Sequence, residues 1–285
     1  MPEKTKRVVK KCISFATKHG VKELELNFCD PKLDCYFTTT LINHELLNFH
    51  ALKEISLGWM EVKLTTIKTL LSNCEALESL SLKRCWNSDD FDLGEENLRL
   101  RKLVVDKCMF RSDSRYFIVN APNLRYFYYS GLNNNFLVID VRSLVMEEEV
   151  LDFYIEFEGR ALFLYKLMED ISSVSVLTVY NYLLQDYDFP DNFNVERFWT
   201  DHARAYGCLI YTLREVEIKG FKGTMIEICV LTYFITIGRV LRNMTINILK
   251  DGVSDQSERL ESYCRDISEM LMSQRASRDL EISIC

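Results

Sequence analysis

The sequence is poor in the residues that build linkers and tails, with 10 glycines and 4 prolines among 285 residues. Such scarcity excludes collagen-like, low-complexity and linker-rich chains. No four lysines or arginines stand in a row, and the formal net charge is −7. This charge disfavours non-specific nucleic-acid binding, because neutralising phosphates needs a cationic face. We therefore expect a packed chain whose partners are not nucleic acids.

Long apolar runs are also missing. The most apolar stretch, residues 228–238, is eleven residues long, whereas a membrane-spanning helix needs about 20, so we predict a buried helix there. The first seven residues are largely polar and lead into an amphipathic stretch rather than an apolar signal core. We expect an intracellular protein of the cytoplasm or nucleus that does not enter a membrane.

The usual motifs of metal and catalytic sites are absent too. None of the ten cysteines forms a Cys-x-x-Cys pair, and the four histidines show no ligand spacing. There is no Gly-x-Ser-x-Gly elbow either. We expect no metal, no cofactor and no catalytic residue, so the chain is predicted not to be an enzyme. A cysteine–histidine pair that meets only in the folded chain stays open as an alternative, because its partners can be far apart in sequence.

A repeated phrase dominates what is present. Leu-x-x-Leu-x-Leu-x-x-Cys occurs three times, ending at Cys29, Cys85 and Cys108, with Val replacing Leu at some positions. Its apolar core returns at 52–57, 124–129, 174–179, 213–218, 241–246 and 277–282, and in degenerate form at 141–146. Alternating leucines predict a short strand that turns them inward, and spacings of 23 to 25 residues are typical of leucine-rich repeats.

Helical patterns separate some of these strands, at 7–19 and 62–72, and Gly20 is suited to end the first helix. The predicted fold is therefore an α/β leucine-rich-repeat solenoid, with a curved parallel sheet on the concave face and helices on the convex face. The cysteines, three residues past the last strand leucine, are predicted to be small buried residues whose S–H groups bond to the turning backbone.

The residues between the strand leucines should form the concave face, where a solenoid binds protein partners. The candidate binding residues are Glu23, Glu25, Ser56, Ser81, Lys102, Tyr126, Tyr128, Tyr180, Glu215 and Glu217. The tyrosines attract most interest because tyrosine is enriched in interface hot spots. The alternative is that loops or neighbouring strands cover Tyr126 and Tyr128.

Two polar segments are interpreted as structural. Gly220-Phe221-Lys222-Gly223 lacks the spacing of a phosphate-binding loop, so we predict a tight turn with a packed Phe. Glu147-Glu148-Glu149 is predicted to be a solvated acidic turn rather than a metal site.

The cysteine-bearing repeats resemble those of plant F-box/leucine-rich-repeat proteins. Residues 208–224, Cys-Leu-Ile-Tyr-Thr-Leu-Arg-Glu-Val-Glu-Ile-Lys-Gly-Phe-Lys-Gly-Thr, resemble the opening of the FBD module that closes many of those proteins. The resemblance implies a leucine-rich-repeat solenoid over 1–204 and an FBD-like α/β cap over 205–285. It also implies a non-catalytic module like the substrate-recognition part of an SCF-type ubiquitin ligase, with an unknown protein as its partner.

Members of that family usually begin with an F-box, which docks a Skp-type adaptor. Here only a short lead without a Leu-Pro opening precedes the first repeat, so we expect the F-box to be lacking. A Skp-type adaptor is then a partner only if the full-length protein has an F-box. Two alternatives stay open: a stand-alone leucine-rich-repeat scaffold or decoy, and a cysteine-dependent hydrolase.

Overall fold

A computed structural model of the chain describes residues 3–28, 49–86, 91–93, 99–109, 116–132, 138–143, 145–154, 174–180 and 207–249, and parts of 262–285. The chain forms two compact units, Met1–Val145 and Met146–Cys285. Each unit is described by itself below.

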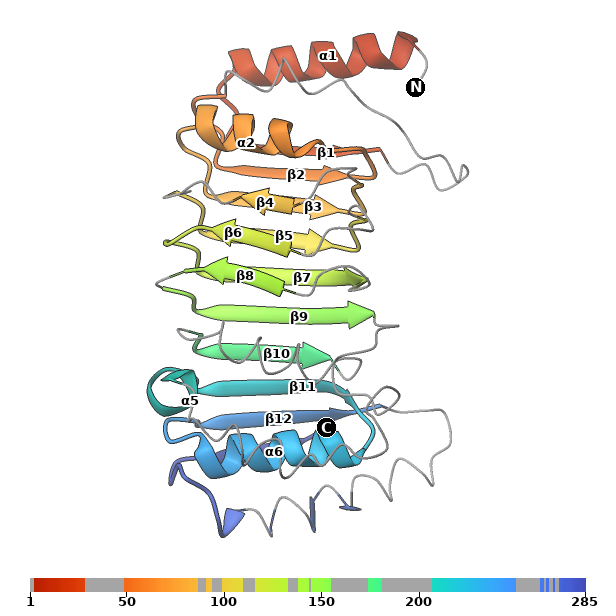
Figure 1. Cartoon of the computed structure of the whole chain (residues 1–285). Helices are drawn as coiled ribbons and strands as arrows, with labels where there is room; N and C mark the ends of the chain where they lie inside the picture. Colours follow the sequence, from red (N-terminus) through yellow and green to blue (C-terminus); the bar gives the residue numbers. More distant parts are fainter. Residues whose placement is uncertain are drawn as a thin grey trace. The chain divides into compact units, whose positions relative to one another are not determined.

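Unit 1 is built on a parallel sheet. Its elements, in chain order, are α1 (Glu3–Lys18), β1 (Glu23–Asn27), β2 (Glu54–Gly58), α2 (Leu64–Asn73), β3 (Ser79–Lys83), β4 (Phe91–Leu93), β5 (Lys102–Asp106), β6 (Tyr116–Asn120), β7 (Tyr126–Leu132) and β8 (Val138–Arg142). Strands β1, β2, β3, β5 and β7 pair in that order, all parallel. Strands β4, β6 and β8 form a separate parallel sheet (Figure 1).

The repeat phrase sets the register of the larger sheet. Leu80 of β3 lies opposite Ile55 of β2 and Leu103 of β5, and all three are buried. The residue before each strand extends the pairing, because its carbonyl accepts two backbone N–H groups from the next repeat. Thus the Arg101 carbonyl accepts from Arg125 at 2.8 Å and Tyr126 at 3.0 Å. The strands predicted at these copies of the phrase are confirmed.

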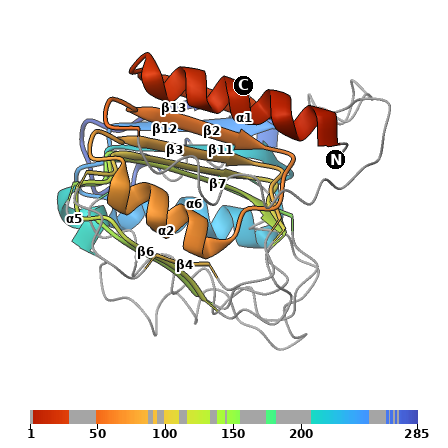
Figure 2. The same cartoon turned by 90° about the horizontal axis from the view of Figure 1, so that it is seen from above.

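The helices expected on the convex face are only partly present. Helix α2 lies between β2 and β3, but β4, β6 and β8 follow β3, β5 and β7. Figure 2 shows α2, β4 and β6 on the same side of the larger sheet. The prediction of helices on that face is therefore wrong for these repeats. The physical reason is the alternation within β6, where Phe117 and Val119 are buried and Ile118 and Asn120 are not, a pattern that suits a strand.

Aromatic rings join the two sheets of unit 1. Phe117 of β6 stacks on Phe91 of β4 with ring centroids 4.3 Å apart. It also meets Tyr129 of β7 edge-on at 5.4 Å and Phe127 at 6.0 Å. Such ring pairs add stabilisation beyond the apolar area they bury. The core of this unit therefore lies between the two sheets.

The same turn conformation follows each of three neighbouring strands, β2, β3 and β5. Trp59, Arg84 and Lys107 have φ angles of 54°, 52° and 51°, in the left-handed region that costs an ordinary residue about 1–2 kcal/mol. Each of these residues directly precedes a buried residue at the end of the phrase: Met60, Cys85 and Cys108, respectively. The repeat thus preserves a strained turn as well as the apolar spacing.

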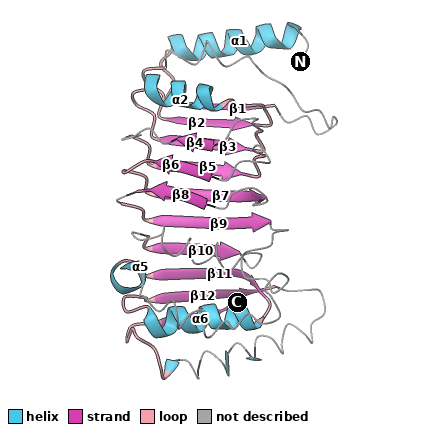
Figure 3. Ribbon diagram, in the orientation of Figure 1, coloured by secondary structure: helices cyan, strands magenta, loops and turns pink. Residues whose placement is uncertain are grey.

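Unit 2 continues the same pattern. Its elements are β9 (Glu148–Tyr154), β10 (Val176–Tyr180), α5 (Gly207–Tyr211), β11 (Glu215–Phe221), α6 (Met225–Ile237), β12 (Asn243–Ile248) and β13 (Glu281–Ile284). The strands pair in chain order and all parallel. In Figure 3 the described strands of this unit are magenta, and α5 and α6 are cyan. Helix α6 confirms the buried helix predicted at 228–238, with Leu231, Phe234 and Ile235 in the core. No helix that the structure describes is long and apolar enough to cross a membrane.

Two weak copies of the phrase were placed wrongly. The strand that pairs with β10 is β9, with Glu149 opposite Leu177, rather than a strand at 141–146. The last copy is shifted by two residues, because Met244 lies opposite Ile282 and not Leu280. The last copy has only two apolar residues at the phrase positions, Leu280 and Ile282, so a two-residue shift leaves its alternation intact and only the pairing fixes the register.

The acidic turn predicted at 147–149 is also wrong. Glu148 and Glu149 lie in β9, and Glu149 is only 4% exposed. Val150, Leu151 and Asp152 are buried as well, so both faces of this strand are covered. Tertiary burial here overrides the preference of carboxylates for solvent, which composition alone does not reveal.

Candidate protein-binding face

Tyr126 and Tyr128 lie on the face of the unit 1 sheet opposite to its core. Phe127 and Tyr129 point toward Phe117 of the small sheet, and successive side chains in a strand point to opposite faces. Tyr126 and Tyr128 are half-buried rather than covered. They are therefore placed on the side where the sequence predicted them.

Strand register arranges this face in two rows. The first row is Glu23, Glu54, Ser79, Lys102 and Tyr126, and the second is Glu25, Ser56, Ser81, Val104 and Tyr128. We call these two rows the polar face of unit 1. Neighbouring strands in a sheet lie about 4.8 Å apart, so residues that are some 25 positions apart in the sequence become adjacent.

The polar face is hollowed by an open groove of about 560 Å³. Its lining residues come from β1, β2, β3 and β5: Glu23, Leu24, Glu25, Glu54, Ile55, Ser56, Ser79, Ser81, Lys83, Lys102 and Val104. The structure thus brings five predicted residues, Glu23, Glu25, Ser56, Ser81 and Lys102, into one groove.

Charge is unevenly distributed along the groove. Glu23 lies directly opposite Glu54, and Glu25 is two residues further along β1, so carboxylates gather over β1 and β2. Lys102, on β5, instead holds its ammonium 5.1 Å from the ring centre of Tyr126, a cation–π distance. Between these ends, the Ser81 hydroxyl oxygen is buried and has no hydrogen-bond partner among the described residues.

In unit 2 the corresponding face is a hydrogen-bonded cluster around Glu217. This carboxylate accepts a hydrogen bond from Asn247 at 2.7 Å and pairs with Lys219 at 3.2 Å. Lys219 also lies 5.4 Å from the ring centre of Tyr180. Burial alone would lower the pKa of Lys219, but hydrogen bonds to Glu217 and Tyr180 outweigh it and the pKa is raised. Tyr180 and Glu217 are therefore held in place by neighbouring strands.

The third predicted residue of unit 2, Glu215, lies nearer the start of β11. It is exposed, and its carboxylate accepts a hydrogen bond from Asn243 of β12 at 3.4 Å. Because Glu215 and Glu217 are two residues apart on one strand, they share this face.

The repeat cysteines have the structural role that the sequence predicted. The Cys85 thiol donates to the Leu57 carbonyl at 3.3 Å, and that of Cys108 to the Leu82 carbonyl at 3.4 Å. Cys29 lies outside the described residues. Burial raises the pKa of Cys108 well above its usual range, and the adjacent Cys85 adds to the rise. A hydrogen bond with Cys108 lowers the pKa of Cys85, but this side chain is 2% exposed and so is poorly placed to meet a substrate.

Cys74 and Cys208 are the other buried thiols in the part of the chain that is described. No cluster of three His, Cys, Asp or Glu side chains could hold a metal there. Burial raises the pKa of Cys74, and that of Cys208 to about 11. Both groups are therefore protonated near neutral pH, when thiols are weak nucleophiles.

The tight turn predicted at 220–223 is only partly present, because Gly220 and the buried Phe221 end β11, and Lys222 and Gly223 lie in the loop before α6. Gly220 and Gly223 both have φ of 75°, where only glycine is free of strain. Sequence reasoning missed Glu227, whose carboxylate accepts N–H bonds from Lys222 at 3.0 Å and Thr224 at 2.9 Å. The signal was available, since Thr-x-x-Glu is the spacing of a helix capping box.

Two known protein families match different parts of this chain. Residues 9–143 match the family described as FBD-associated F-box protein At5g56370, LRR repeats. Residues 205–246 match the FBD family, and they cover α5, β11, α6 and most of β12. The two matches fall in different units of the structure.

Three proteins of Arabidopsis thaliana are similar in sequence to this chain. "Putative F-box protein At3g29830" is 31% identical over 219 residues, which are 62% of this chain and 45% of that protein. "Putative F-box/LRR-repeat protein At1g56400" is 28% identical over 75% of this chain and 50% of its own length. "Putative FBD-associated F-box protein At3g50710" is 24% identical over 82% and 64%, respectively.

This chain spans about half the length of the first two relatives. The repeats and the FBD segment are matched separately, at residues 9–143 and 205–246. The resemblance is thereby confirmed: the chain carries the leucine-rich repeats and the FBD of the F-box/leucine-rich-repeat, FBD-associated proteins.

Proposed function

We propose that this chain is a non-catalytic protein-interaction module and that the polar face of unit 1 binds its partner. The observation that carries the proposal is the groove of about 560 Å³ lined by the variable positions of four successive repeats. The same apolar phrase fixes every strand, so these positions are free to vary with the partner while the core stays unchanged.

The chemistry of the groove favours a protein segment over a small molecule. Small-molecule sites are mostly apolar and enclosed, whereas this groove is open and lined by three glutamates, two lysines and three serines. Glu23 and Glu54 repel each other across neighbouring strands. A cationic side chain of the partner would relieve that repulsion, and the Ser81 hydroxyl offers it a further hydrogen bond.

Tyr126 and Tyr128 continue the same rows on β7. Half-buried tyrosines lose little side-chain entropy on binding and offer large contact areas, which makes them suitable anchors at an interface. We propose that a partner segment crosses the strands from the glutamates of β1 and β2 to these two rings.

The names of the relatives support a role like that of the substrate-recognition part of an SCF-type ubiquitin ligase. In this proposal the repeats form a solenoid that the FBD segment closes, and the protein works inside the cell. A Skp-type adaptor joins it only if the full-length protein has an F-box. A stand-alone scaffold is the alternative, and it predicts that captured partners never include ligase components.

The experiment is affinity purification of the whole chain followed by mass spectrometry, with Tyr126→Ala/Tyr128→Ala as the test variant. The matched control is Tyr211→Ala, since Tyr211 is 74% exposed and lies on α5 rather than on a strand. We expect the test variant to lose proteins that the wild type and the control both retain. Identical captured sets for all three proteins would refute the proposed face.

A further inference from the structure

The first row of the polar face carries its charges in a fixed order. Across β1, β2, β3 and β5 the row runs Glu23, Glu54, Ser79 and Lys102, and all four residues line the groove of about 560 Å³. Among the described residues, none of the three charged side chains has an ion pair. A segment that crosses the strands along this row therefore meets two negative charges, then a hydroxyl, then a positive charge.

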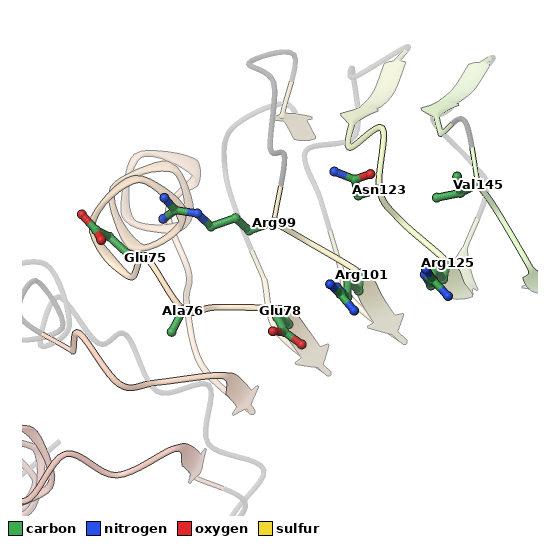
Figure 4. A pocket seen from close by; sticks show the side chains of 8 residues that line it. All are labelled: Glu75, Ala76, Glu78, Arg99, Arg101, Asn123, Arg125 and Val145. Atoms are coloured by element: carbon green, nitrogen blue, oxygen red, sulfur yellow. The ribbon is translucent and has the colours of Figure 1, made fainter.

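The charged residues that stand just before the strands lie outside this groove. Lys22 and Lys53 directly precede β1 and β2, but neither lines the groove. The corresponding residues of β3, β5 and β7 line a separate pocket of about 280 Å³ (Figure 4), and they are Glu78, Arg101 and Arg125. The charge order that a segment meets in the groove is therefore set by the first row itself.

Two carboxylates form the negative end of the row. Glu23 and Glu54 are exposed and lie directly opposite each other, on strands about 4.8 Å apart. No cluster of three ligand side chains in the described part of the chain could hold a metal ion, so a metal ion would find too few ligands here. A guanidinium group has five N–H donors in a planar fork and can serve both carboxylates at once. The negative end therefore suits a basic side chain.

Lys102 forms the positive end of the row. Its ammonium lies 5.1 Å from the ring centre of Tyr126, and this cation–π contact restrains the side chain without supplying a hydrogen-bond acceptor. The three N–H donors of the ammonium therefore suit a carboxylate. Between the two ends, the hydroxyl oxygen of Ser81 has no hydrogen-bond partner among the described residues. The middle of a bound segment should therefore carry a hydrogen-bonding side chain.

The distance between the two ends sets the spacing of the charges that fit them. With strands about 4.8 Å apart, the midpoint between Glu23 and Glu54 lies about 12 Å from Lys102 along the row. Side chains on one side of an extended segment recur every second residue, so residues four positions apart are separated by about 13 Å. A helix would need about eight residues and a width of about 10 Å for the same span, which exceeds a groove of about 560 Å³.

We propose that the first row of the polar face recognises an extended partner segment in which a basic residue stands four positions from an acidic one. The basic side chain lies over Glu23 and Glu54, and the acidic side chain lies over Lys102. This inference rests on the proposed function, because it uses the same face. It adds the chemical class of the segment that the face selects.

The test titrates the whole chain with fluorescein-labelled decapeptides that have blocked ends and a glycine–serine background, and follows fluorescence anisotropy. The first peptide carries one arginine and one glutamate four positions apart. The second has the same composition, with the two charged residues adjacent. The third and fourth carry two arginines or two glutamates four positions apart.

Two variants alter the two ends of the row separately. Glu23→Gln/Glu54→Gln removes the negative end, and Lys102→Glu reverses the positive end. The control is Glu269→Gln/Glu281→Gln, which removes the same charge as the first variant from two exposed glutamates of unit 2.

We expect the first peptide to bind the wild type about fivefold more tightly than the second, a modest factor because exposed ion pairs are weak. Glu23→Gln/Glu54→Gln should weaken binding of the first peptide about fivefold, and the control less than twofold. Lys102→Glu should make the peptide with two arginines the tightest of the four. Such a switch in preference requires a folded chain, so it separates recognition from loss of structure.

Equal binding of the first two peptides, an unchanged preference in Lys102→Glu, or no binding of any peptide would overturn the proposed charge spacing. The capture experiment with Tyr126→Ala/Tyr128→Ala tells this failure apart from failure of the face. If that variant still loses captured proteins, the face binds a partner and only the charge spacing is wrong. If it loses none, the proposed function fails as well.

Discussion

The Cys85 thiol donates a hydrogen bond to the backbone carbonyl of Leu57, one repeat earlier, at 3.3 Å. The thiol of Cys108 does the same to Leu82 at 3.4 Å. Each repeat is thus tied to the preceding strand at the point where the chain turns with a positive φ at Arg84 or Lys107. Each thiol therefore adds a side-chain hydrogen bond between neighbouring repeats to the backbone pairing of β2, β3 and β5.

Replacing Cys108 should test this role. We expect Cys108→Ala to lower the free energy of unfolding by about 1–2 kcal/mol, because it removes a buried sulfur and a hydrogen bond. Urea denaturation followed by circular dichroism measures the change. Cys12→Ala is the control, since Cys12 is exposed, and it should change stability by less than about 0.5 kcal/mol. Equal effects of the two variants would contradict a structural role for Cys108.

The aromatic contact between the two sheets of unit 1 should dominate its stability. Phe117→Ala removes a fully buried ring that meets Phe91, Phe127 and Tyr129, and we expect a loss of about 3–5 kcal/mol. Phe15→Ala, at an exposed ring on α1, should cost less than about 0.5 kcal/mol. The measurement is again urea denaturation, and a loss below about 1 kcal/mol for Phe117→Ala would show that the small sheet contributes little.

Glu227 should stabilise the loop after β11. Glu227→Ala leaves the N–H groups of Lys222 and Thr224 without their acceptor, so we expect a loss of about 2–3 kcal/mol at pH 7. Thr224→Ala removes the hydroxyl that caps the Glu227 N–H and that also hydrogen-bonds the Glu227 carboxylate, and it should cost about 1 kcal/mol. If Thr224→Ala cost more than Glu227→Ala, the carboxylate would not be the anchor.

The same residue should produce a pH dependence. Burial raises the pKa of Glu227 above its ordinary value of 4.5, although backbone N–H groups partly oppose the rise. The folded chain then binds the Glu227 proton more tightly than the unfolded chain does. The stability that comes from this tighter proton binding is fully present below pH 4.5 and is lost as the pH rises through the folded-state pKa of Glu227. The stability difference between wild type and Glu227→Gln should therefore shrink as the pH rises from 4 to 7. A stability difference that grows over this pH range would contradict a raised pKa of Glu227.

Glycine at position 223 should be required by its backbone angle. Its φ of 75° costs an alanine about 1–2 kcal/mol, so Gly223→Ala should lose about that much stability by chemical denaturation. Gly207→Ala is the matched control, because nothing lies within 4 Å of a Cβ at Gly207. The control should be neutral or slightly stabilising, and an equal loss in both variants would rule out the backbone explanation.

The cluster around Glu217 in unit 2 predicts that a substitution there changes the pKa of Lys219. Glu217→Gln removes the carboxylate that pairs with Lys219 at 3.2 Å, so the raised pKa of Lys219 should fall. Nuclear magnetic resonance of the lysine side-chain carbons measures this pKa. Glu215→Gln, two residues away on the same strand and bonded to Asn243, should leave it nearly unchanged. An unchanged titration in Glu217→Gln would remove the pair as the cause.

Several features of the fold were predictable from local sequence. The three cysteine phrases and the buried helix at 228–238 are strongly patterned, and β3, β5 and α6 lie where they were expected. The weak copies at 141–146 and 277–282 misled, because alternation alone does not fix which strand a segment pairs with. The small sheet was missed because it is held by Phe117 of β6, which packs on Phe91 of β4 and on Phe127 and Tyr129 of β7, and local alternation does not reveal these contacts.

The candidate site was also only partly predictable from the sequence. The period-2 pattern alone assigned Tyr126 and Tyr128 to the face away from the core. It did not indicate that Glu23 and Glu54 lie opposite each other, or that Lys102 reaches Tyr126. The repeated Leu-Arg pairs at 100–101 and 124–125 are visible in the sequence, but only backbone pairing shows that Arg101 and Arg125 are neighbours.

The sequence by itself determined the repeat, the inward direction of its leucines and the structural role of its cysteines. These follow from spacing within about ten residues, where backbone geometry alone relates one side chain to the next. The tertiary structure decided the register between strands, the burial of Glu149 and the groove of the polar face. Each of these depends on contacts between residues that are 20 or more positions apart, and such contacts are fixed by the packing of the whole unit.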